Sequence, residues 1–139
     1  MRARSGDVVA AGSPDEGRAT AGPAAAAAAG AARLVLVTVP GEAVAEGLVR
    51  ALVDEGLAAC GTIVPGVLSI YRWRGAVERE REALVILKTT VAAVARLLER
   101  VPELHPYEVP EVLVLGIEAG HAPYLEWLAG SIGSFRDTD

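Results

Sequence analysis

The sequence predicts an α+β domain whose strands and helices follow the order βαββαβ, with one more helix at the C-terminal end. Two observations lead to this fold class. Short apolar runs rich in β-branched residues alternate with segments whose apolar residues recur at helical spacing. A two-residue turn, Arg74-Gly75, joins two long strand-like segments in the middle of the chain. This element order is that of the ferredoxin-like, split βαβ fold.

The chain divides into a tail and a domain. Residues 1–32 are mostly Ala, Gly, Pro and Ser, with an unbroken alanine run from Ala24 to Ala29. Such a segment buries too little apolar surface to offset the entropy lost on ordering. We therefore predict a disordered tail over residues 1–32 and one folded domain over residues 33–139. An export signal is disfavoured, because the alanine run is weakly hydrophobic and acidic residues precede it.

Charge and cysteine content restrict the partners and the compartment. The net charge is −5 at pH 7, and the tail's three arginines are balanced by three acids, so the domain carries the excess. An acidic domain is a poor nucleic-acid binder, and no apolar run reaches the roughly 20 residues that span a bilayer. Cys60 is the only cysteine, which excludes an intrachain disulfide and favours a reducing compartment. We expect a soluble cytoplasmic protein without nucleic-acid or membrane partners.

The first strand and helix follow the tail. Leu34 to Val39 is a continuous apolar run that Pro40-Gly41 ends, which is typical of a buried strand. A helix follows, and Gly56 is its expected stop. Gly47 inside this helix costs roughly 1 kcal/mol relative to Ala, and we expect it to serve close packing. The apolar residues at helical spacing are Val44, Leu48, Ala51 and Leu52.

A long hairpin occupies the middle of the chain. Residues 58–73 form its first strand, with a bulge expected at Pro65-Gly66 because proline cannot donate to a strand ladder. Residues 76–88 form the returning strand. A two-residue turn at Arg74-Gly75 pairs Tyr71 with Glu78 and Ser69 with Glu80. The side chains that would then share one face are Tyr71, Trp73, Glu78, Glu80 and Glu82.

This hairpin is too long for the domain. Thirteen residues at about 3.3 Å each span roughly 43 Å, whereas a domain of this size is only about 33 Å across. The segment from Ala83 to Leu87 is apolar on both faces, as a covered sheet centre requires. The segment from Glu78 to Glu82 alternates acid and base, which protects an exposed strand. We therefore expect an overhanging arm, and a homo-oligomer held by strand contacts across subunits.

The second half repeats the strand and helix order. Thr89 or Thr90 is expected to cap a second helix. Residues 111–118 form the fourth strand, and Pro123 stands in the first turn of the last helix. The apolar stripe of the second helix comprises Val91, Val94, Leu97, Leu98 and Val101, and the last helix turns Leu125, Leu128 and Ile132 inward.

The loop His105-Pro106-Tyr107-Glu108-Val109-Pro110-Glu111 is the strongest functional candidate. Its two prolines prevent helix and stiffen the chain, while an imidazole, a phenol and two carboxylates lie between and beside them. A loop with several such groups is typical of a binding surface. A rigid connector whose polar groups cap neighbouring elements is the alternative, and the loop alone does not decide between the two.

In the long hairpin, in the loop from His105 to Glu111 and in several shorter pieces, the chain resembles the CutA family of divalent-cation-tolerance proteins. About 105 residues are covered, and the tail lies outside the resemblance. Thr62 departs from the family, which commonly has Asn there. The matching pieces are Ala45-Glu46, Leu48 to Cys60, Ile63, Pro65-Gly66, Ser69, Tyr71 to Gly75, Glu82, Leu87-Lys88-Thr89, the loop from His105 to Glu111, and Tyr124-Leu125-Trp127.

The resemblance implies a compact homotrimer of ferredoxin-like subunits built by the long hairpins, with no established catalytic reaction. It also implies binding of divalent metal ions, copper in particular, a role in metal tolerance, and a cleft between subunits. The residues of this chain that match the cleft are Tyr71, Trp73, Lys88, His105, Tyr107 and Glu108.

The candidate metal ligands are His105, Cys60 and Glu108, since copper favours imidazole and thiolate with carboxylate oxygens as supplements. One chain has no tight His or Cys cluster. A trimer could bring three copies of His105 or Cys60 together on its symmetry axis, or combine different residues across an interface. For Cys60 the alternative is a small buried hydrophobic residue. We expect His121 to bind nothing.

Other functions remain open. Lys88 beside the aromatic residues could hold a small anion in a metabolite sensor, or could pair with Glu108 or Glu82 instead. A regulator of the PII type is disfavoured, because Arg74-Gly75 is too short for the long loop of those proteins. A small metabolic enzyme using His105 and Glu108 would need a nucleophile and base pair or a cofactor motif, and neither stands out. A trimeric scaffold acting through protein partners is the remaining class.

Overall fold

The computed structural model describes residues 29–133. Within them a four-stranded sheet with the strand order β2-β3-β1-β4 pairs antiparallel throughout. The element order confirms the predicted βαββαβ arrangement with its terminal helix. The elements are β1 (Ala32–Val39), α2 (Glu42–Asp54), β2 (Cys60–Trp73), β3 (Ala76–Thr90), α3 (Val91–Leu104), β4 (Val112–Gly116) and α4 (Ala122–Gly130).

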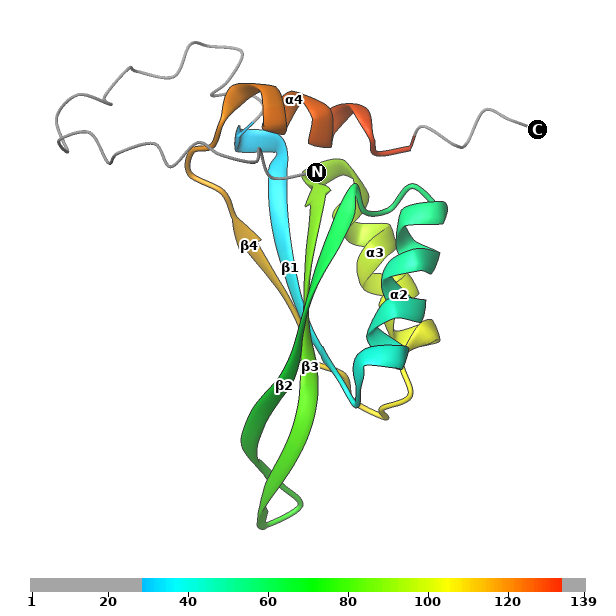
Figure 1. Ribbon diagram of the computed structural model, residues 1–139, viewed down its shortest axis with the longest axis vertical. Helices are drawn as coiled ribbons and strands as arrows, with labels where there is room; N and C mark the ends of the chain where they lie inside the picture. Colours follow the sequence, from blue (N-terminus) through cyan, green and yellow to red (C-terminus); the bar gives the residue numbers. More distant parts are fainter. Residues whose placement is uncertain (1–28, 134–139) are drawn as a thin grey trace, which may run out of the picture.

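Helices α2 and α3 lie beside each other on one face of the sheet, and α4 crosses one end of it (Figure 1). Alternate residues of β1 and β3 point into the layer between this face and the helices. They meet the inward residues of α2 and α3, and the buried side chains form one core. The buried residues of this face therefore recur at every second position along β1 and β3, as expected for strands. Its fully buried members include Val35, Val37, Val85, Leu87, Leu52, Leu97 and Val101.

The opposite face of the same sheet is apolar and largely uncovered within the subunit. We call it the open face and define it by Leu34, Leu36, Val64, Leu84, Ile86, Leu113 and Leu115, which share one side of the sheet by register. Leu113 is 54% exposed and Leu115 42%. The expectation that residues 83–87 form a centre covered on both faces is thus wrong for a single subunit, because α2 and α3 lie on the same side.

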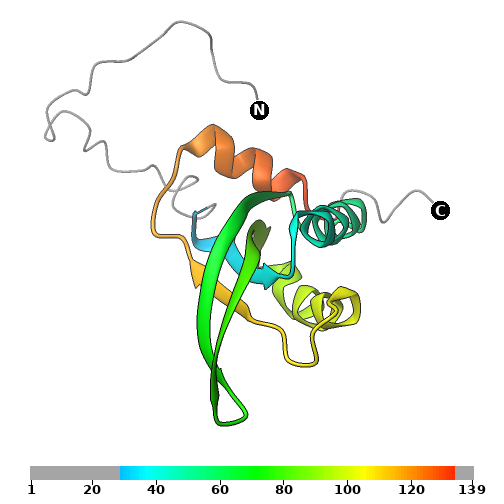
Figure 2. The ribbon, with the colours of Figure 1, turned by 60° about the horizontal axis from the view of Figure 1, so that its bottom comes forward.

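The hairpin of β2 and β3 extends beyond the helices, as predicted (Figures 1 and 2). Arg74 and Gly75 both have positive φ, at 48° and 83°, the geometry of a two-residue type I′ turn. Tyr71 pairs with Glu78 as the turn requires. The register shifts between Val64 and Val67, which confirms the bulge at the proline and glycine there.

Two helical details differ from the sequence prediction. Thr90 is the N-cap of α3, but its side chain makes no cap hydrogen bond. Thr89 instead donates from Oγ1 to the Leu57 carbonyl over 2.7 Å and fixes the entry to β2. The predicted stripe of α3 was also too wide, since Val91 is 51% exposed and Leu98 40%. The buried residues of α3 are Ala93, Leu97 and Val101, so the small side chain of Ala93 takes a buried place instead.

Gly47 has no atom within 4 Å of the position that a Cβ would occupy. The expectation that it serves close packing is therefore wrong, and the glycine lies on an exposed part of α2. Its helical position imposes no need for glycine, so the residue only weakens the helix.

The described structure begins four residues before the predicted domain boundary. Ala29 and Ala32 are buried against Ala59, Leu125 and Leu128, in a second apolar cluster below α4. Two of the predicted inward residues of the last helix, Leu125 and Leu128, are thereby confirmed, whereas Ile132 lies beyond the end of α4 and is only partly buried. The remainder of the predicted tail, residues 1–28, lies outside the described residues. No helix in the described part of the chain is long and apolar enough to cross a membrane.

Candidate functional site

The loop between α3 and β4 is fixed to the sheet by His105. The side chain is only 8% exposed. Its Nε2 lies 2.7 Å from the carbonyl oxygen of Thr38, and its Nδ1 lies 3.1 Å from the backbone N–H of Tyr107. A carbonyl can only accept and an N–H can only donate, so the neutral imidazole protonated at Nε2 satisfies both contacts. His105 therefore positions the loop.

Tyr107 connects the loop to the hairpin. Its hydroxyl donates to Glu82 Oε2 over 2.8 Å, and Glu82 is only 6% exposed. Burial, followed by this hydrogen bond and the neighbouring carboxylates, raises the pKa of Tyr107 well above its usual range. The phenol thus remains protonated at neutral pH and continues to donate to the buried carboxylate. In this way one hydrogen bond fixes the distance between the loop and β3.

The tip of the hairpin also contacts the loop. Arg74 places one guanidinium nitrogen 3.1 Å from Glu108 Oε2, and the guanidinium carbon lies 5.3 Å from the centre of the Trp73 ring. Both charged side chains are more than two-thirds exposed, so this ion pair adds at most about 1 kcal/mol of stability. It sets the position of the turn more than it stabilises the fold.

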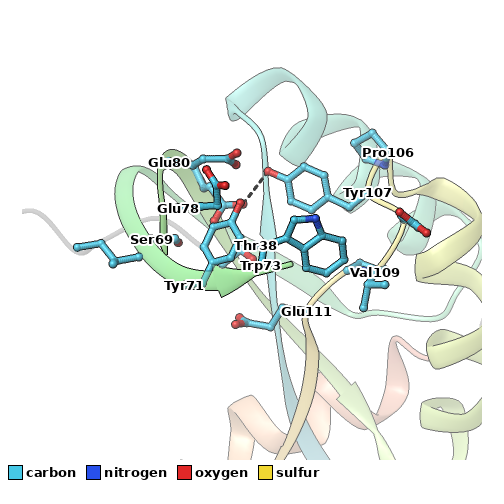
Figure 3. A pocket seen from close by; sticks show the side chains of 14 residues that line it. Thr38, Ser69, Tyr71, Trp73, Glu78, Glu80, Pro106, Tyr107, Val109 and Glu111 are labelled. Carbon is cyan, nitrogen blue, oxygen red and sulfur yellow. Dashed lines mark hydrogen bonds between the residues drawn. The ribbon is translucent and has the colours of Figure 1, made fainter. Parts of the chain in front are cut away.

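A cleft of about 910 Å³ lies between the hairpin and the loop. Figure 3 shows Tyr71 and Trp73 from the hairpin and Tyr107 from the loop around the same space. The lining includes five glutamates and neither Lys nor Arg, so the cleft is strongly acidic. The remaining lining residues are Thr38, Ser69, Ile70, Glu78, Glu80, Glu82, Pro106, Glu108, Val109, Pro110 and Glu111.

Most of the predicted cleft residues meet at this place, but two do not. Tyr71, Trp73, Tyr107 and Glu108 line the cleft, whereas Lys88 does not belong to its lining and His105 faces the sheet behind it. Lys88 pairs with Cys60 and Leu34 near the other end of the sheet, and its ammonium donates to the Thr62 hydroxyl. The apolar pattern of a strand does not by itself predict which end of the sheet the last residue of that strand reaches.

Sequence reasoning missed the acidic side of the cleft. The hairpin register predicts that Glu78, Glu80 and Glu82 share a face with Tyr71, but the alternation of acid and base predicts only the protection of an exposed strand. The loop from His105 to Glu111 could have identified them, because the hydroxyl of a buried Tyr107 needs a hydrogen-bond acceptor, and Glu82 provides it.

The candidate metal ligands do not converge in one subunit. Cys60 is partly buried and lies with its Sγ 3.6 Å from the Tyr124 hydroxyl. Burial, followed by this contact, raises the pKa of Tyr124 to about 12. Cys60 lies opposite Lys88 of β3, whereas Thr38, the hydrogen-bond partner of His105, lies opposite Leu84. Because Lys88 and Leu84 are four residues apart on β3, Cys60 and Thr38 are roughly 13 Å apart along the strand direction. In residues 29–133, no three His, Cys, Asp or Glu side chains gather closely enough to hold a metal ion.

The sequence matches known proteins over nearly the same range as the folded domain. A family model described as "CutA1 divalent ion tolerance protein" covers residues 33–131. The divalent-cation tolerance protein CutA of Thermus thermophilus is 52% identical over 100 residues, which cover 72% of this chain and 97% of that protein. Human protein CutA is 40% identical over 109 residues, covering 78% of this chain and 61% of the human protein.

Solved structures agree with this match. The Cut A1 structure from Thermus thermophilus superposes with a TM-score of 0.71 at 51% identity, covering 73% of this chain and 99% of that chain. CutA1 from Oryza sativa gives a TM-score of 0.72 at 42% identity, covering 73% and 94%. A structure from Archaeoglobus fulgidus, titled as a periplasmic divalent cation tolerance protein, gives 0.70 at 29% identity and covers 72% and 97%.

Proposed function

The chain belongs to the CutA1 divalent ion tolerance family, and from this premise we propose that it acts as a homotrimer that binds divalent metal ions, copper foremost, and contributes to tolerance of such ions. The observation that carries the proposal is the family match over residues 33–131, which includes the hairpin and the His-Pro loop. We assign no catalytic reaction to it. A cytoplasmic location is also part of the proposal, supported by the single cysteine.

The open face supports the homotrimer. Its apolar residues occupy the centre of the sheet, and large contiguous apolar patches on a soluble subunit mark interaction sites. The strand order leaves β2 and β4 at the two edges of the sheet, where unpaired backbone groups can pair with another copy. The overhanging hairpin carries Tyr71 and Trp73, each 38% exposed. Association of copies would cover all three features at once.

The trimer also offers a route to a metal site. One subunit lacks a three-ligand cluster within the described residues, so a site built from Cys60, His105 and Glu108 has to draw on more than one subunit. Glu108 is exposed enough to reach a neighbour. His105 would have to exchange its contact with Thr38 or Tyr107 for the metal. Metal binding is therefore expected to compete with the anchoring of the loop.

A copper titration tests the proposal. Metal-free protein, titrated with Cu²⁺ in a calorimeter, is expected to give saturable binding that weakens at least about tenfold in a His105→Gln variant, since an amide is a far poorer ligand than an imidazole. The matched control is His121→Gln, because His121 is exposed and lies outside the cleft lining. Saturable binding that persists unchanged in His105→Gln would contradict the role of His105, and absence of binding in the unaltered protein would contradict the metal assignment.

A small-metabolite sensor is the second candidate function, and the cleft is the observation that favours it. Its volume of about 910 Å³ is in the range of small-molecule sites. An anionic ligand held by Lys88 is not favoured, because Lys88 lies outside the lining and five glutamates line it. An enzyme using His105 is also not favoured, because both ring nitrogens already have partners.

A further inference from the structure

The hairpin of β2 and β3 carries opposite charges on its two sides. The residues from Glu78 to Glu82 alternate acid and base, and neighbouring residues of a strand point to opposite sides. The glutamates therefore share one side, and the register adds two aromatic residues of β2 to it. We call this side the acidic face, and its members are Tyr71, Trp73, Glu78, Glu80 and Glu82.

The other side of the same hairpin is basic. We call it the basic face, and its members by register are Leu68, Arg72, Val77, Arg79 and Arg81. All five are exposed, and Val77 is exposed to 67%. Arginine is enriched in protein interfaces, and apolar side chains that are exposed together mark interaction sites. The basic face is therefore a second contact surface, back to back with the acidic one.

The charges of the two faces are not neutralised within the subunit. Adjacent glutamates and arginines of β3 point to opposite sides, so they cannot pair with each other. Among residues 29–133, no ion pair involves a carboxylate of the acidic face or a guanidinium of the basic face. Arg81 donates only to the backbone carbonyl of Gly66, over 3.2 Å. Each face thus lacks the counter-charge that the opposite face of another copy carries.

A ring of copies needs two different, complementary surfaces on every copy, because the same surface of each copy meets the second surface of the next. The hairpin projects beyond the helices (Figures 1 and 2), so neighbours on both sides can reach its two faces. Two hairpins stacked about a two-fold axis would instead bring like charges together, which is unfavourable. The opposite charges therefore favour a ring over a two-fold pair.

We propose that in the assembled protein the acidic face of each hairpin packs against the basic face of the next copy, so that charge sets the direction of the ring. The carboxylates accept hydrogen bonds from the arginines of the neighbour, and the exposed rings of Tyr71 and Trp73 contact its guanidinium and aliphatic groups. The acidic cleft is then complete only in the assembly. This inference rests on the proposed homotrimer and adds which surfaces meet in it.

Charge exchange between the faces tests the pairing, with light scattering of the full chain as the measurement. Glu78→Lys combined with Glu80→Lys leaves two basic faces, and Arg72→Glu combined with Arg79→Glu leaves two acidic ones. Each pair of substitutions is expected to weaken association at least about a hundredfold, because like charges then meet. The four substitutions together exchange the charges of the faces and are expected to restore the trimeric mass, because every contact again joins opposite charges.

The matched control is Glu46→Lys combined with Glu99→Lys, which makes the same change of charge at exposed positions of α2 and α3 and is expected to leave the mass unchanged. Circular dichroism checks the fold of each variant. A trimer that either pair of hairpin substitutions leaves as stable as before, or that the control weakens equally, would overturn the pairing of the faces and leave the homotrimer intact. A single-chain mass for the unaltered protein would overturn both.

Discussion

The two faces of the sheet are built from alternate residues of the same strands, yet one face is buried under helices and the other is left largely uncovered. Val85 and Leu87 point to the helices and are fully buried, whereas Leu84 and Ile86 point to the open face and are only partly buried. Both pairs are equally apolar. Periodicity therefore does not distinguish the faces, and only the placement of α2 and α3 does. An apolar face that its own subunit leaves open supports the proposal that copies of the chain associate.

The largest expected change in stability comes from a substitution on the covered face, which is the face of the sheet that packs against α2 and α3. Leu87→Ala removes a fully buried side chain from the core and is expected to lower the free energy of unfolding by about 2–5 kcal/mol. Chemical denaturation at several protein concentrations measures it, and the loss should occur at all of them. Ile86→Ala, its neighbour on the open face, is expected to act mainly through association, so that its effect depends on concentration. Equal, concentration-independent losses in both variants would remove the distinction between the faces.

His105 lies where the covered layer meets the cleft. His105→Ala leaves the Thr38 carbonyl and the Tyr107 N–H, both partly buried, without their partners and is expected to lower the free energy of unfolding by about 2–4 kcal/mol. Thermal unfolding measures the loss. The exposed His121 provides the control, and His121→Ala is expected to stay within about 0.5 kcal/mol of the unaltered protein. A similarly small effect at His105 would show that the loop is held by other contacts.

Alkaline pH is expected to lower the stability of the protein through Tyr124, which lies on the side of the sheet that α2 and α3 do not cover. Burial raises the pKa of Tyr124 to about 12, above the ordinary value of about 10. The folded state thus favours the neutral phenol, so this stability is complete below about pH 10 and is lost as pH rises toward 12. We expect the free energy of unfolding to fall by about 1–2 kcal/mol over this range.

Tyr124→Phe is the comparison for this pH dependence, because it keeps the ring and removes the titrating hydroxyl. Denaturant titrations between pH 9 and 12 are expected to give a flatter profile for the variant. An identical profile in both proteins would assign the alkaline loss to other groups, Tyr107 among them.

The smallest expected effect concerns the outer surface of the helical layer. Gly47 is exposed and a Cβ there would meet nothing, so Gly47→Ala is expected to stabilise the chain by about 0.5–1 kcal/mol. The midpoint of denaturant unfolding measures this gain. Destabilisation instead would indicate that the surface of α2 contacts something beyond the subunit.

The sequence predicted the fold well because local chemistry decides it. The positive φ that Arg74-Gly75 accepts sets the turn, and the turn alone fixes the pairing of Tyr71 with Glu78 and Ser69 with Glu80. The proline at position 65 likewise identified the bulge. These features depend on a few neighbouring residues, and nothing distant in the chain can change them.

The candidate site was predicted less completely, because it depends on contacts between distant segments. The roles of Glu82 and His105 depend on Tyr107 and Thr38, which are far away in sequence. Periodicity also gave no reason to exclude Lys88 from the cleft. The burial of Ala29 and Ala32 under α4 was missed because alanine carries little apolar surface, although it packs where larger side chains cannot fit.

The mass of the protein in solution tests most directly whether copies of the chain cover the open face. Light scattering at micromolar concentration is expected to give three times the 14.4 kDa mass of one chain, and Ile86→Glu, which places a charge on the open face, is expected to reduce it to the mass of one chain. A single-chain mass for the unaltered protein would contradict the account, because the open face and the overhanging hairpin would then remain exposed to water.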